Sequence, residues 1–271
     1  MKQKKAALLN NGIPWMGGLS GVEKVYGGGR MERLRELTDM VPGIVTGDDV
    51  QERADDLRDV EVVFSTWGMP ALTDRQLEFL PNLKALFYAA GATSRFREPL
   101  LKRGVKVCSA SAANAIPVAE FALSQVLLAG TGYFRNSREF MRAKGRNKAT
   151  LFRGHGNYGG RVALLGNGAI SQRLQDLLSR HVLDVAVVPS RKQNRTLSIE
   201  DAFATSFAVV NLFPDRDDNA GVLNAPLFDR MMENAAFINV GRGRQVDEAG
   251  LIRVLKQRPD LTALLDVQWP E

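Results

Sequence analysis

The chain has one cysteine and two histidines among its 271 residues, and these shortages exclude several kinds of protein. Cys108 has no partner for an internal disulfide, so a reducing compartment is expected and we predict a cytoplasmic protein. We identify no metal-binding motif and predict no metal site. Long apolar segments are also missing: no run of about 20 apolar residues is evident, so we expect no membrane-spanning helix. The apolar run Ala6–Leu9 behind the basic start is too short for a signal peptide.

Positive charge is present in excess, with a formal net charge of +6 and a pI of about 9.6. Such a balance invites a nucleic-acid interpretation, but the charges are scattered along the chain. The densest basic run, Arg135–Lys148, is better explained as a solvated helix end or a subunit arm. We therefore predict no nucleic-acid partner, and a positive field that helps to gather anionic substrates and cofactors.

Short apolar runs alternate with longer amphipathic stretches along most of the chain. Several runs are rich in valine, as expected of strands buried on both faces of a sheet. Strands that alternate with helices predict an α/β fold of parallel sheets with right-handed crossovers. The candidate strands are Ala6–Asn10, Val60–Ser65, Ala85–Ala89, Val105–Ser109, Arg161–Leu165, Asp184–Val188, Phe207–Leu212, Ala235–Val240 and Thr262–Val267. The candidate helices include Met31–Leu37, Ser171–Arg180 and Glu248–Gln257.

A longer helical pattern separates the first four predicted strands from the other five. It is expected to begin near Pro117, a favourable residue in a first turn, with Asn114 just ahead. We place a domain boundary before it. The prediction is two Rossmann-like or flavodoxin-like domains, a first over residues 1–115 and a dinucleotide-binding second over residues 116–271.

The strand Arg161–Leu165 runs into a glycine turn and then into a helix. In dinucleotide-binding proteins the first glycine of such a turn makes the bend, and the second lets the backbone approach a pyrophosphate. The amides and the positive end of the helix dipole then face the phosphate charge. The turn predicts a nucleotide site formed by Gly166, Asn167, Gly168, Ala169 and Ile170.

Two positions depart from the usual nucleotide pattern. Ser171 stands where a third glycine is common, and its small side chain still allows close packing. The next strand would normally end in an acid that binds the adenosine ribose, but Pro189 stands there, followed by Ser190 and Arg191. Without the acid, a 2′-phosphate can bind Ser190 and Arg191, so NADP is favoured over NAD. The alternative is that Arg191 belongs to a solvated loop and that NAD binds without this contact.

Four further segments give the chain a resemblance to the D-isomer-specific 2-hydroxyacid dehydrogenases, and to glyoxylate/hydroxypyruvate reductases among them. Segment 112–120 resembles the entry to that family's long inter-domain helix, and segment 237–248 resembles its arginine segment. Segment 263–271 is similar to its strand-plus-acid segment. Phe213, Pro214 and Asn219 match the loop that covers the adenine side. These motifs follow the family's order and spacing over nearly the whole chain.

The resemblance implies a hydride transfer between NAD(P)H and a small 2-oxo acid or D-2-hydroxy acid. Arg242 would bind the substrate through its planar fork. Backbone amides at Ala90 and Gly91 would bind the substrate carboxylate in a cleft between the domains. Glu271 matches the acid that raises the pKa of a catalytic histidine.

The resemblance also places Val240, Gly241 and Asp266 near the cofactor, with Asp266 close to the nicotinamide amide. Each role has a simpler alternative. Arg242 can be a loop arginine, Asp266 can cap a turn, and the Ala90 segment can be an ordinary turn after a strand.

The family's catalytic histidine lies downstream of the acid that Glu271 matches. His155 and His181 are the two histidines of this sequence, and neither matches the catalytic position. A structural role is expected for both. The family's C-terminal segment also returns to the first domain. We therefore expect this sequence to be a C-terminally truncated dehydrogenase with impaired turnover.

The main alternative is a catalytically inactive protein that binds NAD(P)H as a sensor or scaffold. A methyltransferase with the same glycine turn is a weaker alternative, because it leaves Arg242, Asp266 and Glu271 unexplained. The long helix and the arm Tyr133–Lys148 suggest a homodimer, against a monomer with a solvated basic helix end. Substrate specificity is expected to depend on the segment around Trp67, a residue that fits a pocket wall, a lid or the core.

Overall fold

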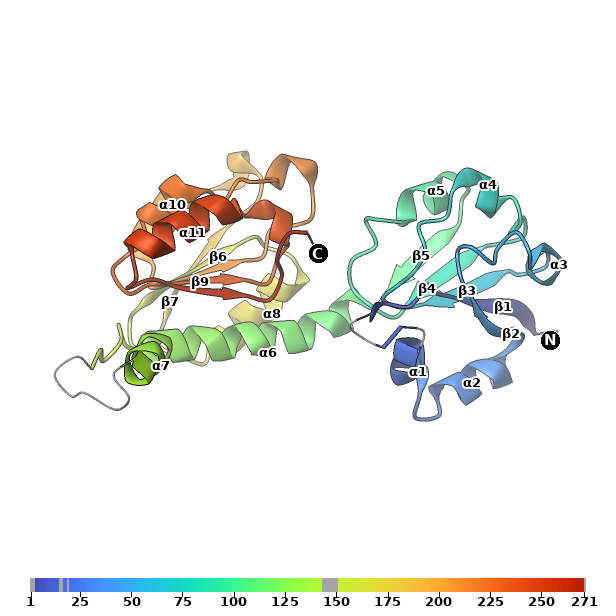
Figure 1. The fold of residues 1–271 in the computed structure, drawn as a ribbon, viewed down its shortest axis with the longest axis horizontal. Coiled ribbons are helices and arrows are strands. Elements are labelled where there is room, and N and C mark those ends of the chain that lie inside the picture. Colours follow the sequence, from blue (N-terminus) through green and yellow to red (C-terminus); the bar gives the residue numbers. More distant parts are fainter. Residues whose placement is uncertain (1–2, 15–16, 19, 143–150, 271) are drawn as a thin grey trace. The chain divides into compact units, whose positions relative to one another are not determined.

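The computed structural model describes residues 3–14, 17–18, 20–142 and 151–270. The chain divides into two compact units, Met1–Asn114 and Ala115–Glu271, which are drawn in Figure 1. The boundary lies one residue before the position expected from the sequence. Each unit is built around its own parallel sheet with helices on both faces, as the α/β prediction requires.

Unit 1 contains a five-stranded parallel sheet with the strand order β2-β1-β3-β4-β5. This is the flavodoxin-like order, in which the direction of winding reverses between the first and third strands. The predicted flavodoxin-like class is therefore confirmed for this unit. The strands are β1 (Lys4–Leu9), β2 (Thr38–Val45), β3 (Val62–Ser65), β4 (Ala85–Tyr88) and β5 (Lys106–Ser109).

Helices cover both faces of the first sheet because alternate strand residues point to opposite sides. On one face, Leu57, Leu77 and Leu100 belong to a buried cluster with Leu9 and other strand residues. These leucines come from α3 (Ala54–Leu57), α4 (Asp74–Leu77) and α5 (Arg97–Lys102). On the other face, α1 (Ser20–Tyr26) and α2 (Arg30–Leu37) lie over the sheet (Figure 1), and Val22 and Tyr26 pack with Leu8.

Strand β2 was not predicted, because its sequence does not read as a strand. It contains Asp39, Pro42 and Gly43, residue types that are depleted in strands. The pairing register shifts within it: Ala6 pairs with Met40, but Leu8 pairs with Ile44. Three residues of β2 therefore stand opposite Ala7 alone. An edge strand tolerates this bulge, since only one side of it pairs.

Unit 2 contains a second five-stranded parallel sheet, with the order β10-β9-β8-β6-β7. Numbered within the unit, this is again the order 2-1-3-4-5, and the winding reverses between β6 and β8. Ligands of such folds bind outside the carboxyl ends of the strands at this point. The strands are β6 (Arg161–Leu165), β7 (Asp184–Val188), β8 (Ala208–Asn211), β9 (Ala236–Asn239) and β10 (Thr262–Leu265).

The second sheet also carries helices on both faces (Figure 1). Residues of α6 (Ser111–Gly130) and α8 (Ala169–Leu178) pack in one buried cluster with Val162 and Leu164 of β6. The other cluster contains Ala163 and Leu165 and residues of α9 (Ile199–Thr205), α10 (Ala225–Asp229) and α11 (Glu248–Gln257). The predicted helix Glu248–Gln257 is confirmed, and α8 begins two residues before the predicted Ser171. Short 3-10 turns also belong to the unit: η2 (Lys192–Asn194), η3 (Asp217–Asn219) and η4 (Gly243–Gln245).

The long helix α6 begins at Ser111, so the predicted start near Pro117 is wrong. The backbone amide of Asn114 already donates to Ala110, which starts the helix a full turn earlier. A proline inside a helix removes one backbone hydrogen bond. Burial of Ala115, Ala119 and Ala122 nevertheless stabilises the helix on both sides of Pro117. Packing therefore overrides the local preference of proline.

By length and composition, α6 could cross a membrane, which the sequence analysis did not anticipate. Its buried stripe of Ala119, Ala122, Val126 and Ala129 belongs to the core of unit 2. A core helix passes the same test of length and composition. The helix that follows, α7 (Tyr133–Arg142), is held to unit 2 by Arg138, which donates to Thr262 and to the carbonyl of Leu261.

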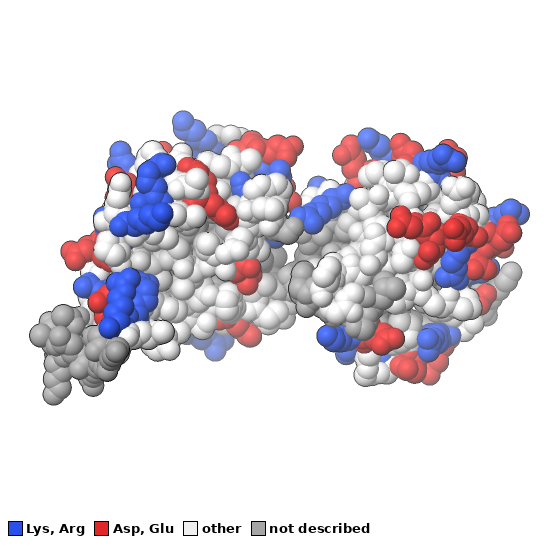
Figure 2. Space-filling model, viewed as in Figure 1, with Lys and Arg blue, Asp and Glu red and all other residues white. Residues whose placement is uncertain are grey.

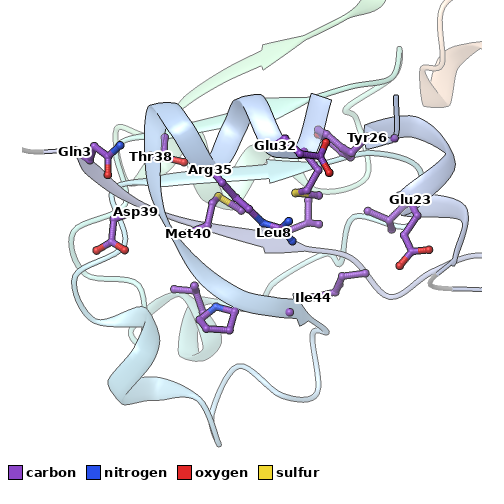
Figure 3. A pocket seen from close by; sticks show the side chains of 16 residues that line it. Gln3, Leu8, Glu23, Tyr26, Glu32, Arg35, Thr38, Asp39, Met40 and Ile44 are labelled. Carbon is purple, nitrogen blue, oxygen red and sulfur yellow. The ribbon is translucent and has the colours of Figure 1, made fainter. Parts of the chain in front are cut away.

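A hollow of about 750 Å³ lies in unit 1 between α1, α2 and β2. Figure 3 shows the side chains that line it, among them Leu8, Tyr26 and Met40. Neither Ala90 nor Gly91 lines this hollow, so it is separate from the substrate loop expected from the sequence. Figure 2 shows basic and acidic side chains interspersed over the face in view, in keeping with the scattered charges of the sequence.

Candidate functional site

The glycine turn of unit 2 joins the carboxyl end of β6 to the start of α8. Gly166 has φ +122°, a conformation that residues with a side chain rarely adopt. A Cβ atom added there would lie 2.5 Å from the carbonyl oxygen of Leu212, at the end of β8. The tight turn therefore requires glycine on two independent grounds.

Gly168 serves the opposite purpose, because open space surrounds it. An added Cβ would meet nothing within 4 Å, and its φ of −88° is ordinary. Gly168 is also the N-cap of α8 and offers no side chain to the first amides of that helix. Asn167, Gly168 and Ala169 are exposed and Ile170 is half-buried. Amides at the positive end of a ten-residue helix, with room in front of them, fit the phosphates of a dinucleotide.

Ser171 takes the place of a third glycine and is fully buried. Its hydroxyl lies 3.2 Å from the side-chain amide of Gln175, one helical turn onward. The small side chain therefore fits the close packing of α8, as expected from the sequence.

The loop after β7 gathers positive charge around Ser190. Arg195 donates to the carbonyl oxygens of Pro189 and Ser190, both at 2.8 Å. Arg216, from the loop after β8, donates to the Ser190 hydroxyl at 3.3 Å. Arg191 is exposed beside them. The sequence had indicated Ser190 and Arg191, but not the two arginines that approach from other positions in the chain.

One acid belongs to this basic group. Asp218 receives two hydrogen bonds from Arg216, at 2.8 and 3.1 Å. These bonds, helped by the charges of Arg216 and Arg191, hold the pKa of Asp218 below its usual value. Beside this loop lies a hollow of about 710 Å³, whose lining includes Lys192, Arg195 and Arg230.

The residues expected on the adenine side are largely buried. Phe213 belongs to the core of unit 2, and the guanidinium of Arg195 lies 5.9 Å from its ring centre. Asn219 is buried, and its side chain donates to the carbonyl of Pro214 at 2.9 Å. Both side chains therefore hold the loop after β8 in shape, whereas Pro214 is exposed and available to a ligand.

A buried network of three amide side chains joins the ends of β8 and β9. The Asn211 side chain donates at 2.8 Å to the side-chain oxygens of Asn239 and of Gln245. Gln245 in turn donates to the carbonyls of Phe213 and Pro214. The sequence analysis missed this network, although polar residues ending two apolar strands were a signal for it.

The network fixes the backbone at Arg242. Its amide donates to Gln245 at 3.1 Å, and its carbonyl accepts from Asn239 at 3.4 Å. The preceding Val240 and Gly241 are buried, and an added Cβ on Gly241 would lie 2.7 Å from the Asn211 side chain. The Arg242 side chain remains 30% exposed, so it is available to a ligand at this edge of the sheet.

The sequence predicts two functional acids near the end of the chain, Asp266 and Glu271, and the structure describes the first of them. The backbone amide of Asp266 donates to Asn239 at the end of β9, and its side chain is exposed. This places Asp266 at the same sheet edge as Arg242. Glu271 lies outside the described residues.

In unit 1, Ala90 and Gly91 follow β4, with Ala90 buried and Gly91 half-buried. An added Cβ on Gly91 would lie 3.1 Å from the Asn114 side chain, so the loop is closely packed. Next to it, the buried Asn10 side chain donates to the carbonyl of Trp67 at 2.9 Å. Asn10 was not identified from the sequence, although an asparagine directly after an apolar strand was a signal. Trp67 itself is 38% exposed.

The two histidines have the structural settings expected of them. His155 stacks on Phe207 with ring centres 5.9 Å apart, and its Nε2 lies 2.9 Å from the carbonyl of Glu233. His181 follows the end of α8. In the part of the chain that the structure describes, no hydrogen bond or ring contact joins either histidine to Ser190, Arg242 or Asp266. Within the described residues, no group of three or more metal-ligating side chains is found.

Comparison with known proteins gives this geometry a family context. A family model described as the NAD binding domain of D-isomer specific 2-hydroxyacid dehydrogenases matches residues 125–271. YoaD of Bacillus subtilis (strain 168), provisionally named a 2-hydroxyacid dehydrogenase, is 26% identical over 214 residues. That match covers 74% of this chain and 61% of YoaD, so the chain spans about three fifths of this relative.

Solved structures of low sequence identity share the fold. The 3-phosphoglycerate dehydrogenase of Entamoeba histolytica, with NAD+ bound, superposes with a TM-score of 0.70 and 16% identity, covering 100% of this chain and 82% of that one. An acyclic imino acid reductase in complex with NADPH and D-Arg superposes with a TM-score of 0.72 and 19% identity, and the match covers 98% of this chain and 84% of that one. Both structures confirm the Rossmann-like α/β fold.

The two glycines of the turn make contrasting predictions. Gly166→Ala is expected to lower the free energy of unfolding by about 1–3 kcal/mol, because it forces a side chain into positive φ and against Leu212. Gly168→Ala is expected to leave that free energy unchanged and to weaken ADP binding, since its methyl group enters the open space before α8. Urea unfolding and titration calorimetry test both variants. Unweakened ADP binding by Gly168→Ala would contradict the placement of the phosphates.

Proposed function

The chain belongs to the D-isomer specific 2-hydroxyacid dehydrogenase family, and on that premise we propose that it transfers a hydride between NAD(P)H and a small 2-oxo acid. The substrate class is that of a carboxylate beside a carbonyl group, as in glyoxylate or hydroxypyruvate. The activity, substrate and partners of the whole protein are part of this proposal. The backbone at Ala90 and Gly91 is proposed to contact the substrate carboxylate.

One observation carries the proposal: three adjacent strands of unit 2 end in complementary groups. The open turn at Gly168 follows β6, the loop of Phe213 and Pro214 follows β8, and Arg242 follows β9. Since β6, β8 and β9 are neighbours in the sheet, these groups share its carboxyl edge. An anion-binding turn and a partly exposed arginine at one edge fit a nucleotide and an acidic substrate.

The residues divide the work of the reaction between them. Amides at the start of α8 bind the phosphates and so fix the dinucleotide on the sheet edge. The dinucleotide, when bound, supplies or accepts the hydride. Arg242 orients the 2-oxo acid and stabilises the negative charge that develops on its carbonyl oxygen. The amide network behind Arg242 fixes the backbone from which that cation extends.

We further propose that the cofactor is NADP(H) rather than NAD(H). Pro189 stands after β7 in the place of the ribose-binding acid, so no carboxylate at that position repels a 2′-phosphate, and the next residue is Ser190. Arg191, Arg195 and Arg216 surround it, and Arg216 is within hydrogen-bond distance of its hydroxyl. Guanidinium groups bind phosphate through paired hydrogen bonds, which supports the assignment of this loop to the 2′-phosphate.

A homodimer formed through α6 and α7 is also proposed. Phe121 and Leu128, which are seven residues apart and so lie on one side of α6, are exposed, Ile116 is exposed elsewhere on that helix, and Tyr133 at the start of α7 is 54% exposed. Apolar residues gathered on one helix surface are typical of a subunit interface. The far part of the expected arm, residues 143–148, lies outside the described residues.

The role of Arg242 is tested by Arg242→Gln. The variant is expected to lower kcat/KM for 2-oxo acids by about 10²–10³, the effect of removing a donor to a developing oxyanion. Loss of the reduced cofactor, followed by absorbance with a panel of 2-oxo acids, measures it. Arg253→Gln, on the exposed side of α11, is the control. A wild-type protein that binds NAD(P)H yet reduces none of the acids would favour a sensor or scaffold.

The cofactor assignment is tested by the affinities for NADPH and NADH, measured by titration of cofactor fluorescence. The wild-type protein is expected to prefer NADPH. Arg216→Gln is expected to weaken NADPH binding about tenfold and to leave NADH binding unchanged, because one charge-assisted hydrogen bond to the 2′-phosphate is lost. Equal weakening for both cofactors, or a wild-type preference for NADH, would contradict the assignment.

The homodimer is tested by sedimentation at micromolar concentration. The wild-type protein is expected to sediment as a dimer, and the double variant Phe121→Asp, Leu128→Asp as a monomer, since two charges would be buried in the interface. Ile252→Asp, at an exposed apolar residue on α11, should leave the dimer intact. A wild-type monomer would overturn the proposal.

A further inference from the structure

Asp215 lies in the loop after β8, with its carboxylate between two arginines of the segment after β9. Its Oδ1 accepts a hydrogen bond from Nε of Arg244 at 2.7 Å, and Nη2 of Arg244 is equally close. Its Oδ2 lies 3.8 Å from Nε of Arg242. The Asp215 side chain is only 20% exposed, so its charge is partly shielded from water. The Asp215 carboxylate therefore interacts with both guanidinium groups.

The guanidinium of Arg242 is approached from two sides. Its Nη1 donates to the carbonyl of Gly241 at 2.8 Å, and its Nε faces Asp215. The backbone at Arg242 is fixed by Gln245 and Asn239, so the remaining freedom lies in the side chain. Attraction to a carboxylate at 3.8 Å restricts that freedom without forming a tight hydrogen bond.

We propose that Asp215 is a positioning residue for Arg242, and that Arg244 neutralises Asp215 so that its charge does not oppose an anionic substrate. This inference rests on the proposed function, in which Arg242 orients the 2-oxo acid and stabilises the negative charge that develops on its carbonyl oxygen. Asp215 and Arg244 contact neither substrate nor cofactor in it; they act through Arg242.

The chemistry explains why two arginines are needed. A lone carboxylate beside Arg242 would orient it, but would also compete with the substrate for the same cation. Arg244 prevents this competition because its two nitrogens at 2.7 Å hold Asp215 more tightly than Arg242 does at 3.8 Å. Arg244 is charged throughout the physiological pH range, as arginines are, and its hydrogen bonds to Asp217 and Asp215 raise its pKa further.

The two residues therefore have different expected phenotypes. Asp215→Asn keeps the shape but removes the charge that orients Arg242, so kcat is expected to fall about fivefold while KM does not rise. Arg244→Gln leaves the Asp215 charge uncompensated, so KM for the 2-oxo acid is expected to rise about fivefold. The double variant Asp215→Asn, Arg244→Gln should return KM to the wild-type range, because no uncompensated carboxylate remains beside Arg242.

Binding of oxalate to the cofactor-loaded protein, measured by calorimetry, gives a readout that does not depend on turnover. Oxalate is an analogue of a 2-oxo acid in which a second carboxyl group replaces the carbonyl group. The reduced cofactor cannot transfer a hydride to it. Its affinity should fall in Arg244→Gln, and should not fall in Asp215→Asn or in the double variant. A purely structural role would instead weaken binding in all three and lower their Tm together.

Asp217→Asn is the matched control. Asp217 also bonds to Arg244, at 2.8 Å, but it is fully exposed and no contact joins it to Arg242 within the described residues. It should leave kcat, KM and oxalate affinity unchanged. Wild-type kcat in Asp215→Asn, or wild-type oxalate affinity in Arg244→Gln, would overturn the inference. Failure of the proposed function is distinguishable, because oxalate would then bind Arg242→Gln as well as the wild-type protein.

Discussion

Three buried amide side chains, those of Asn211, Asn239 and Gln245, hold the candidate site together. Buried amides must find partners for their donors and acceptors, and here the partners are one another and the backbone of two loops. The loop after β8 and the segment of Arg242 therefore cannot move independently. A parallel sheet supplies strand ends at a common edge, but this network converts them into one rigid platform.

On that platform, two of the cations are already paired with aspartates. Arg216 bonds to Asp218, and Arg244 bonds to Asp215 and Asp217. An anionic ligand that binds here exchanges existing hydrogen bonds for new ones, so its net gain is smaller than the number of arginines suggests. Because these arginines are already paired, the loop does not bind every anion. It favours ligands whose geometry matches that of the guanidinium groups.

The fold was predictable from the sequence where local pattern and tertiary packing agree. The valine-rich strands of unit 2 and the turn at Gly166 have strong local signals, and the structure places them as expected. Strand β2 was missed because a sheet edge tolerates its Pro42 and Gly43, and the start of α6 was misplaced because burial outweighs the preference of Pro117. At the site, the contacts of Gln245 with Asn211 and of Arg216 with Ser190 could not be predicted, since these partners lie 34 and 26 residues apart along the chain.

The irregular register of β2 bears on how the protein behaves at high concentration. β2 is an outer strand of its sheet, and outer strands offer unpaired backbone groups to which another molecule can add. Pro42 removes one of the donors, and Gly43, with φ +74°, turns the backbone away from the extended path. The same bulge that hides this strand from sequence patterns thereby disfavours edge-to-edge pairing at this side of unit 1.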